Sequence, residues 1–260
     1  MMRYENLVYE QKPFDGVYVL DVHGHIGFEQ GSQLGPHDGK SIVHTMDRMG
    51  VDAVCVSYSP GLRGDWKRGN DITAQVCGAY RGRVLGYAAP NPFHKDCDVS
   101  EYFAEDRGFV GIKIHGNIQG ETPENDPRYA HAFELANKRK LPVLFHAWMP
   151  YEIDRAADVA RQYPDLKVII GHGGLTFARE HAVAVCKKYD NVYCDTAISS
   201  APDGSIEWLV DKIGIDRVLY GSDMTFFDCI HTMGKIALAK LTDEEKEKIF
   251  GLNAKSLFGL

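Results

Sequence analysis

The sequence predicts an α/β protein: a single (β/α)8 barrel with a C-terminal helical extension, one domain spanning residues 1–260. Short runs rich in aliphatic residues recur eight times along the chain. Segments with the apolar spacing of amphipathic helices separate the later runs. No linker rich in Pro, Gly or Ser divides the chain, so eight alternations of strand and helix are expected to form one barrel.

The eight runs are expected to be buried strands, because each is short and rich in Val, Ile, Leu and Tyr. In chain order they are Val17–Asp21, Ala53–Tyr58, Arg83–Ala89, Val110–His115, Pro142–His146, Val168–His172, Val192–Asp195 and Val218–Tyr220. Their spacing fits a strand, a loop and a helix per unit. An open doubly wound sheet is the alternative, weakened because no Gly-x-Gly-x-x-Gly follows the first strand.

Amphipathic helices are expected between the later strands. The clearest one covers residues 126–139, opens with Asp-Pro and places Tyr129, Phe133 and Ala136 on one side. Three further segments have similar patterns: Glu152–Tyr163, Phe177–Lys188 and Ile206–Ile213. Together with the strands, they give the alternating order of a barrel.

The two ends of the chain are expected to differ in structure. Thr242–Phe250, followed by Asn253–Phe258, has the charged, periodic pattern of a helical extension. By contrast, Met1–Pro13 is short and polar and is expected to be no more than a lead-in.

The composition is that of an ordinary globular protein, with 44% hydrophobic and 25% charged residues. Acidic residues outnumber basic ones 36 to 29 and no basic block stands out, which argues against nucleic-acid binding. The six cysteines are scattered without a C-x-x-C pair. No apolar run approaches the ~18 residues that span a bilayer. We therefore expect a cytoplasmic protein without a signal peptide and with neither nucleic-acid nor membrane partners.

The most informative segment is Asp21-Val22-His23-Gly24-His25, which follows the first apolar run. Residues two apart on a strand point to the same face, so the imidazoles of His23 and His25 are expected to aim at one spot. Taken alone, such a pair more often consists of ordinary core or surface histidines. Whether this pair forms part of a functional site depends on which residues stand at the ends of the later strands.

Polar side chains also stand at the ends of the later strands. They are Lys113 and His115 on the fourth strand, His146 on the fifth, His172 on the sixth and Asp223 on the eighth. Because a barrel gathers the C-terminal ends of its strands around one axis, these side chains are expected to converge. Imidazole and carboxylate groups are donors that Zn²⁺ prefers. The sequence therefore predicts a divalent-metal site at this end of the barrel.

This ordered set resembles the amidohydrolase superfamily, and within it the ACMSD-like branch of metal-dependent hydrolases and decarboxylases. The resemblance covers almost the whole chain. It rests on the His-x-His of the first strand, Gly-Ile-Lys-Ile-His, the histidines of strands five and six, Tyr-Gly-Ser-Asp and the closing stretch Leu241–Phe258.

The resemblance implies that one Zn²⁺ is bound by four residues. They are His23, His25, His146 and Asp223. It also places His172 beside the metal, where it would steer the metal-bound water, and Asp223 and His172 are the expected catalytic residues. Asp223 would accept a proton from a metal-bound water, whose pKa the cation brings to about 7, and His172 would polarise the substrate.

Lys113 leaves the number of metals open. In binuclear members of the superfamily a carboxylated lysine from strand four bridges two metals, and a second metal held in that way by Lys113 is one alternative. The favoured alternative is a single metal, with Lys113 contacting the substrate or Asp223.

The loops after the strands are expected to form the substrate pocket, and Lys113 and His115 share an inward face from which they would contact the substrate. Arg63, in a basic loop, is either a clamp for a substrate carboxylate or a solvated residue. Trp148 and Phe226 either form an apolar wall around an aromatic or small cyclic substrate or pack the loops. The long Gly-rich segment 28–40 is either a lid or a plain loop.

Three functional hypotheses follow for this chain. The first is a Zn²⁺-dependent hydrolase of a C–N or C–O bond in a small, anionic substrate. The second keeps the site but changes the reaction to non-oxidative decarboxylation of an aromatic or unsaturated carboxylic acid. The third is a barrel that binds a metal or ligand without catalysis. Members of the family often form homodimers, and an exposed apolar helix face would support one here.

Overall fold

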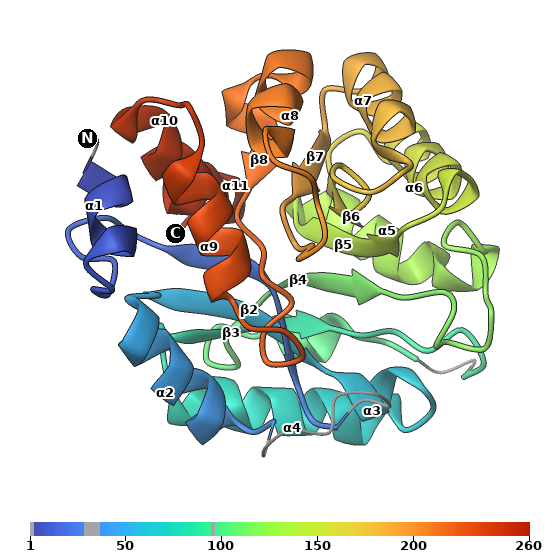
Figure 1. Ribbon diagram of the computed structural model, residues 1–260. Helices are drawn as coiled ribbons and strands as arrows, with labels where there is room; N and C mark the ends of the chain where they lie inside the picture. Colours follow the sequence, from blue (N-terminus) through green and yellow to red (C-terminus); the bar gives the residue numbers. More distant parts are fainter. Residues whose placement is uncertain (1–2, 29–36, 95–96) are drawn as a thin grey trace.

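The computed structural model describes residues 3–28, 37–94 and 97–260, and it has eight parallel strands with helices around them (Figure 1). The strands are β1 (Leu20–Ile26), β2 (Ala53–Tyr58), β3 (Val84–Ala88), β4 (Phe109–Ile114), β5 (Pro142–Ala147), β6 (Lys167–His172), β7 (Val192–Asp195) and β8 (Val218–Leu219). Each strand pairs with the next one in sequence. The predicted (β/α)8 barrel is confirmed.

The barrel closes between β8 and β1 through the residues that follow β8. The backbone N–H of Val22 donates to the carbonyl of Tyr220 at 2.9 Å, and Gly24 forms a parallel bridge with Met224. The barrel is therefore nearly complete, with its shortest strand at the junction. This junction brings the segment after β8 against the His-x-His of β1.

Most strands agree with their predicted bounds to within two residues, but the first one does not. The apolar run predicted for it covers residues 17–21, whereas β1 begins at Leu20 and continues to Ile26. The reason is its pairing with β2, which runs from Leu20 opposite Ala53 to Ile26 opposite Tyr58. His23 and His25 thus lie within the first strand, as expected from the face that they share.

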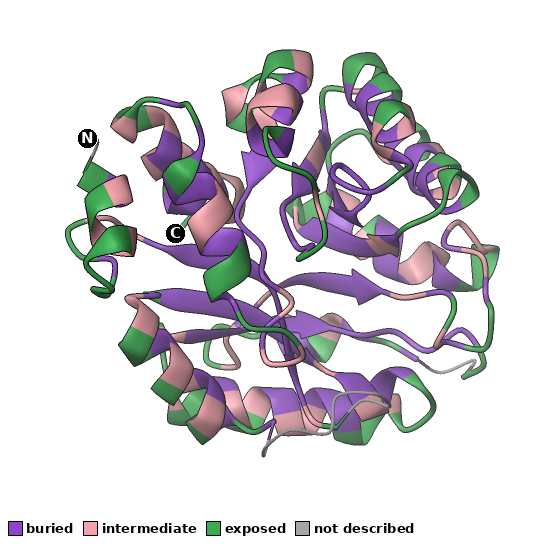
Figure 2. Cartoon of the chain, viewed as in Figure 1, coloured by how far each residue is buried: buried purple, intermediate pink, exposed green. Residues whose placement is uncertain are grey.

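Helices surround the barrel, and their buried sides face the strands while their outer sides are exposed (Figure 2). They are α2 (Gly39–Met49), α3 (Ser59–Leu62), α4 (Trp66–Ala79), η1 (Ser100–Phe103), η2 (Pro127–Tyr129), α5 (Ala130–Arg139), α6 (Pro150–Gln162), α7 (Arg179–Lys188), α8 (Ser205–Ile213), η3 (Ile215–Arg217) and α9 (Ile230–Leu238). The helices predicted between the later strands correspond to η2 with α5 and to α6, α7 and α8.

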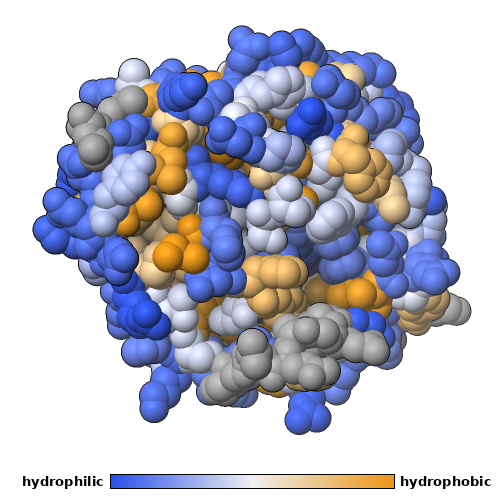
Figure 3. Space-filling view, viewed as in Figure 1, coloured by the Kyte–Doolittle hydropathy of each residue, from blue (hydrophilic) through white to orange (hydrophobic). Residues whose placement is uncertain are grey.

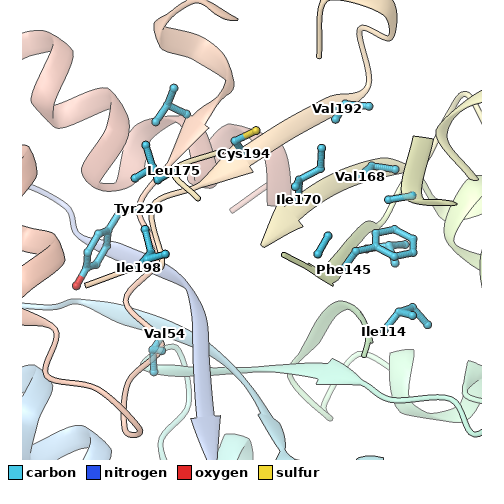
Figure 4. Close-up of a cluster of buried hydrophobic side chains, with 14 of the residues drawn as sticks. Val54, Ile114, Phe145, Val168, Ile170, Leu175, Val192, Cys194, Ile198 and Tyr220 are labelled. Atoms are coloured by element: carbon cyan, nitrogen blue, oxygen red, sulfur yellow. The ribbon is translucent and has the colours of Figure 1, made fainter. Parts of the chain in front are cut away.

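Two sets of buried side chains alternate along the strands, as the two-residue period of a strand requires. One set packs between strands and helices and includes Phe145 and Ile170 (Figure 4). The other set fills the barrel interior and includes Cys55, Leu144 and Ile169. This alternation decides which polar side chains of each strand reach the barrel axis.

The C-terminal extension consists of α10 (Asp243–Glu247), η4 (Lys248–Leu252) and α11 (Asn253–Phe258). Side chains of α11 join the barrel-interior cluster, and the ring of Phe258 lies 6.2 Å from that of Tyr87 between centroids. The extension therefore packs against one end of the barrel interior. The polar strand ends lie at the other end.

The expectation for residues 1–13 was wrong, because α1 (Arg3–Tyr9) forms there. Its Tyr4 is fully buried, with its ring centroid 6.0 Å from Phe14 and 5.7 Å from Phe250. The Tyr4 hydroxyl donates to Glu247 at 2.6 Å. The short polar segment is helical because it packs against residues more than 240 positions away, which the local pattern could not reveal.

Replacing Tyr4 by phenylalanine is expected to lower the free energy of unfolding by about 2 kcal/mol, because the carboxylate of Glu247 loses a hydrogen bond while the aromatic packing stays. Urea denaturation followed by circular dichroism measures this. The exposed Tyr9→Phe in the same helix is the control and should change stability by less than ~0.5 kcal/mol. Equal effects of the two variants would contradict the proposed anchoring of α1.

All six cysteines are free and buried. Across the described residues, no helix is both long and apolar enough to cross a membrane. The face shown in Figure 3 is largely hydrophilic, with several apolar patches between. Ile230 and Leu238 of α9 are exposed apolar residues of the kind expected for a dimer interface, and a homodimer stays a prediction.

Candidate active site

A bulge in β1 places the first histidine of the site. Leu20 and Val22 both belong to the barrel-interior cluster, so strict alternation would turn His23 toward the outer face. The pairing with β2 shifts by one residue between Asp21 and Gly24, and this shift restores an inward direction. The His-x-His pair therefore points into the barrel because of a β-bulge that cannot be recognised in the sequence.

His23 lies at the centre of the cluster and is fully buried. Its Nδ1 is 2.6 Å from Oδ2 of Asp195, and its Nε2 is 2.9 Å from Nζ of Lys113 and 3.5 Å from Oδ1 of Asp223. A carboxylate only accepts hydrogen bonds, so it assigns the ring proton to Nδ1. Nε2 then carries a lone pair and faces the other polar groups.

His25 joins the same cluster from the next inward position. Its Nε2 is 2.9 Å from Oδ1 of Asp223, and its Nδ1 is 3.2 Å from the hydroxyl of Ser59. The imidazole stacks on Phe226, with 4.5 Å between centroids and 10° between planes. Asp223 thus lies between both histidines of β1, as the sequence predicted for a shared site.

Histidines at the C-terminal ends of β4, β5 and β6 form a second row, with His115 directly after β4. His115 stacks on His146 with 3.7 Å between centroids and 10° between planes. Nδ1 of His146 is 3.1 Å from Nε2 of His172, whose own Nδ1 donates to the carbonyl of Ala197. The indole of Trp148 lies 5.3 Å from the His172 ring. With its Nδ1 donating, His172 has Nε2 as the nitrogen that can accept a proton.

Backbone strain marks two residues of this cluster. His172 and Asp223 both have φ of 66°, a left-handed conformation that costs non-glycine residues on the order of 1–3 kcal/mol. Hydrogen bonds hold them there: the His172 N–H donates to Asp195 at 2.8 Å, and the Asp223 N–H donates to the carbonyl of His23 at 2.7 Å. These are the two residues for which the sequence predicts catalytic roles.

Burial favours the neutral form of three imidazoles in this cluster, those of His23, His25 and His146. Burial, followed by the positive charge of Lys113, holds the pKa of His23 well below its ordinary value. Burial also lowers the pKa of His25, although Asp223 opposes this. For His146, burial and then His115 lower the pKa well below its ordinary value. Neutral imidazoles are the form that coordinates a cation.

The charged members shift in different directions. Burial lowers the pKa of Lys113 to about 8, against the opposing effects of Asp223 and Asp195. Burial alone would raise the pKa of Asp223, but the hydrogen bond from His25 and the nearby His172 outweigh it, so this pKa lies well below its usual value. Asp223 is therefore ionised and available as an anionic ligand.

Two carboxylates of this site were missed as functional residues. Asp195 ends β7 and accepts from His23, from the N–H of His172 and from the N–H of Ala197 at 3.1 Å. Asp21 accepts from the N–H groups of His23 at 2.9 Å and Ser222 at 3.1 Å and from the Ser222 hydroxyl. Their places at strand ends were visible in the sequence, but the groups they bind come from other strands.

The donor atoms suit a divalent cation. One nitrogen each of His23 and His172 and one oxygen of Asp223 lie within 4.8 Å of one another. His25 adjoins Asp223, and His146 adjoins His172. His172 was expected beside the ion rather than as a ligand, but it lies in the same group of donor atoms as the expected ligands His23 and Asp223. Two imidazoles and a carboxylate in one group are the donors of a zinc- or manganese-type site.

The other predicted substrate contacts divide into two groups. Lys113, His115, Trp148 and Phe226 all contact the histidine cluster, as described above. Arg63 is exposed just after α3, and its contact with a substrate stays a prediction. Of the segment predicted as a lid or loop, residues 29–36 lie outside the described residues.

A barrel with buried imidazoles and carboxylates at the C-terminal ends of its strands defines the class of metal-dependent (β/α)8-barrel enzymes. Within this class, the Amidohydrolase family model matches residues 21–260, and the chain belongs to that family. The resemblance to the amidohydrolase superfamily is thereby confirmed, together with the enzymatic nature of the protein.

The chain is similar to several decarboxylases. It is 24% identical over 247 residues to gamma-resorcylate decarboxylase of Rhizobium sp. (strain MTP-10005), covering 75% of this chain and 76% of that protein. The structure of 2,6-dihydroxybenzoate decarboxylase in complex with 2,6-dihydroxybenzoate matches with a TM-score of 0.76 and 17% identity, over 94% of this chain and 100% of the other. A dihydroxybenzoic acid decarboxylase from Polaromonas sp. JS666, with bound manganese and the inhibitor 2-nitroresorcinol, matches with a TM-score of 0.73 and 16% identity, over 94% and 97%. These structural matches establish the shared fold.

Proposed function

We propose that this protein is a metal-dependent, non-oxidative decarboxylase of a small aromatic carboxylic acid. The observation that carries the proposal is the Asp223 carboxylate between the imidazoles of His23 and His25 in a buried, aromatic-walled barrel mouth. The relatives named above are decarboxylases of hydroxylated benzoates, which favours this reaction over the hydrolysis that ranked first from the sequence. The strain at His172 and Asp223 argues against a barrel that only binds.

The donor set defines where the cation would bind. His23, His25, His146 and Asp223 are the proposed ligands, and His172 lies beside them. When bound, the ion supplies a positive charge that stabilises negative charge developing on the substrate. Because one relative contains manganese, Mn²⁺ is tested here beside the Zn²⁺ that the sequence favoured. One ion per chain is proposed, with Lys113 as an unmodified amine.

Decarboxylation breaks the bond between the ring carbon and the carboxylate, leaves the electron pair on the ring, releases CO2 and adds a proton to the same carbon. We assign the proton transfer to Asp223, whose carboxylate lies 2.9 Å from Nε2 of His25. Because it is ionised at rest, it would first take up a proton from solvent as the substrate binds and then pass that proton to the ring carbon. Nε2 of His172 lies 3.1 Å from Nδ1 of His146, and His172 belongs to the same group of donor atoms as His23 and Asp223. Burial of these groups keeps water away from the carbon that is protonated.

Binding of the substrate would use the remaining side chains. Lys113 is buried, and with a pKa of about 8 it is largely positive at neutral pH, so it can pair with the substrate carboxylate. Trp148 and Phe226 lie against His172 and His25 and would flank an aromatic ring. Arg63 is a second proposed contact for an anionic substrate.

The proposal is tested by incubating the purified protein, loaded with Mn²⁺ or Zn²⁺, with a panel of hydroxybenzoates and following CO2 release. We expect CO2 from at least one of them, 2,6-dihydroxybenzoate being the first to try. A panel of amides, esters and lactones is assayed in parallel. Hydrolysis of these without any CO2 release would replace the decarboxylase by the hydrolase.

Removal of the metal is expected to abolish CO2 release. Dialysis against a chelator should lower the rate by at least about 100-fold, and one equivalent of Mn²⁺ or Zn²⁺ should restore it, because the ion supplies charge stabilisation that the protein alone lacks. Elemental analysis should give one ion per chain, and intact mass should show no carboxylated lysine. Full activity of metal-free protein would contradict the proposed site.

The proposed setting of the enzyme follows from the same residues. We place it in the cytoplasm, where six free, buried cysteines would stay reduced. A homodimer through the exposed apolar residues of α9 is part of the proposal, and its mass in solution tests it.

A further inference from the structure

Glu152, in the first turn of α6, is a fully buried carboxyl group outside the histidine cluster. Its Oε2 accepts from the backbone N–H groups of Trp148 at 2.6 Å and Met149 at 2.8 Å. Its Oε1 accepts from the side-chain amide of Asn117 at 3.0 Å. A buried carboxyl group needs such partners, and a place at the N-terminus of a helix suits it.

Helix capping explains one of these three contacts. In a capping box, the glutamate at the third helical position accepts from the N–H of the residue just before the helix, which is Met149 here. The bonds from Trp148 and Asn117 lie outside that motif. Asn117 follows β4 and Trp148 follows β5, so Glu152 joins the segments after two neighbouring strands at the mouth of the barrel.

The indole of Trp148 depends on this backbone support. Its ring lies 5.3 Å from that of His172 and 6.4 Å from that of His146 between centroids, but the residue is 36% exposed, so packing holds it only in part. His146 belongs to β5 and is held by the pairing of that strand with β6. Trp148 lies beyond the strand, where the two N–H bonds to Glu152 are shorter than the 3.5 Å contact from the Thr176 hydroxyl to the Trp148 carbonyl.

We propose that Glu152 is a positioning residue that fixes the segment after β5, so that the indole of Trp148 forms one wall of the substrate pocket. This inference rests on the proposed function, in which Trp148 flanks an aromatic ring. Glu152 contacts no reacting atom and acts through Trp148. Metal binding should not depend on Glu152, because strand pairing holds His146 without it.

Three variants of α6 test the proposal. Glu152→Ala leaves the N–H groups of Trp148 and Met149 without their acceptor, so the segment after β5 should shift. Glu152→Gln keeps an oxygen that can accept from both, and its NH2 can donate to Asn117 once that amide turns its oxygen round. The exposed Asp154→Ala in the same helix is the control.

The position of Trp148 is measured without any ligand or metal, by ¹⁹F NMR of protein labelled with 5-fluorotryptophan. The chain has three tryptophans, and Trp148→Phe assigns the signal of Trp148. Glu152→Ala is expected to shift this signal while that of Trp208 stays. Glu152→Gln and Asp154→Ala should give the wild-type spectrum. An unchanged Trp148 signal in a folded Glu152→Ala protein would overturn the proposal.

The consequence for the pocket is measured by calorimetry, with benzoate as the probe and Mn²⁺-loaded protein. Glu152→Ala should weaken benzoate binding by about 10-fold, the upper range of what one aromatic contact contributes, and Glu152→Gln should stay within about twofold of the wild type. Mn²⁺ affinity, from competition with a chelator, should change by less than about threefold. The double variant Glu152→Ala/Trp148→Ala should bind benzoate no more weakly than Trp148→Ala alone.

Circular dichroism shows whether each variant is folded. If Glu152→Ala is not folded, Glu152→Asp takes its place, because its carboxylate is one methylene shorter and should give the same NMR shift and weaker benzoate binding. A further loss of about 10-fold in the double variant would overturn the proposal, since Glu152 would then act elsewhere. Equal losses of Mn²⁺ and benzoate affinity would also overturn it, because they indicate a general structural role.

The CO2 assay separates this inference from the proposed function. If the variants behave as expected but the wild type releases no CO2, the decarboxylase proposal fails and the positioning role of Glu152 stands. If the wild type releases CO2 but the Trp148 signal does not respond to Glu152→Ala, the positioning role fails alone. A wild type that binds no benzoate also overturns the assignment of Trp148 as a wall of the pocket.

Discussion

Asparagine at position 223 is expected to lower kcat for CO2 release by about 10³-fold, the range in which a positioned acid–base group contributes to catalysis. The carboxylate of Asp223 accepts from Nε2 of His25 at 2.9 Å and is 3.5 Å from Nε2 of His23. An amide at this position neither carries a proton to carbon nor supplies an anionic ligand. The variant should therefore also contain less metal, as measured by elemental analysis.

Folding provides the control for this variant. The N–H of Asp223 donates to the carbonyl of His23, a backbone contact that asparagine keeps. Asparagine also tolerates the φ of 66° better than most residues. We expect unfolding by urea to change little, and the exposed Asp216→Asn to retain full activity. An Asp223→Asn variant that turns over at the wild-type rate would rule out the assigned proton transfer.

Much of the fold could be predicted because each strand is a short apolar run whose ends can be recognised in the local sequence. The seventh strand, Val192–Asp195, has the predicted bounds unchanged. The histidines of strands five and six and Asp223 could be predicted as neighbours, because a barrel gathers strand ends whatever lies between them. Such a prediction needs only the order of the elements.

What could not be predicted depends on contacts between distant segments. The bulge that turns His23 inward exists only in the pairing of β1 with β2. The helix of residues 3–9 depends on packing against Phe250 and a bond to Glu247. The left-handed backbone of His172 is held by Asp195 from the next strand. None of these has a local sequence signal.

The same dependence explains why Asp195 was predicted only as the last residue of a strand. Its Oδ2 accepts from His23, and its Oδ1 accepts from the N–H groups of His172 and Ala197. His172 then donates to the carbonyl of Ala197. One buried carboxylate therefore sets the ring proton of the first candidate ligand and the backbone of a proposed catalytic residue, His172.

Replacing Asp195 by asparagine is expected to weaken metal binding by about 10–100-fold. The amide oxygen can still accept from the backbone N–H groups of His172 and Ala197, which turns the amide NH2 toward Nδ1 of His23. Nδ1 must then accept, so the ring proton moves to Nε2 and removes the lone pair that faces Asp223. Competition titration with a chromophoric chelator measures the affinity, and NMR of the ring nitrogens of His23 reports the tautomer.

Two further variants show whether this effect acts through the tautomer. Asp195→Ala removes all three accepted hydrogen bonds and should also destabilise the fold, because the N–H of His172 loses its partner. The exposed Asp216→Asn is the matched amide control and should bind metal normally. If Asp195→Asn shifts the tautomer of His23 without changing metal affinity, His23 is not a ligand. If affinity falls while the tautomer stays, the carboxylate acts instead through its charge.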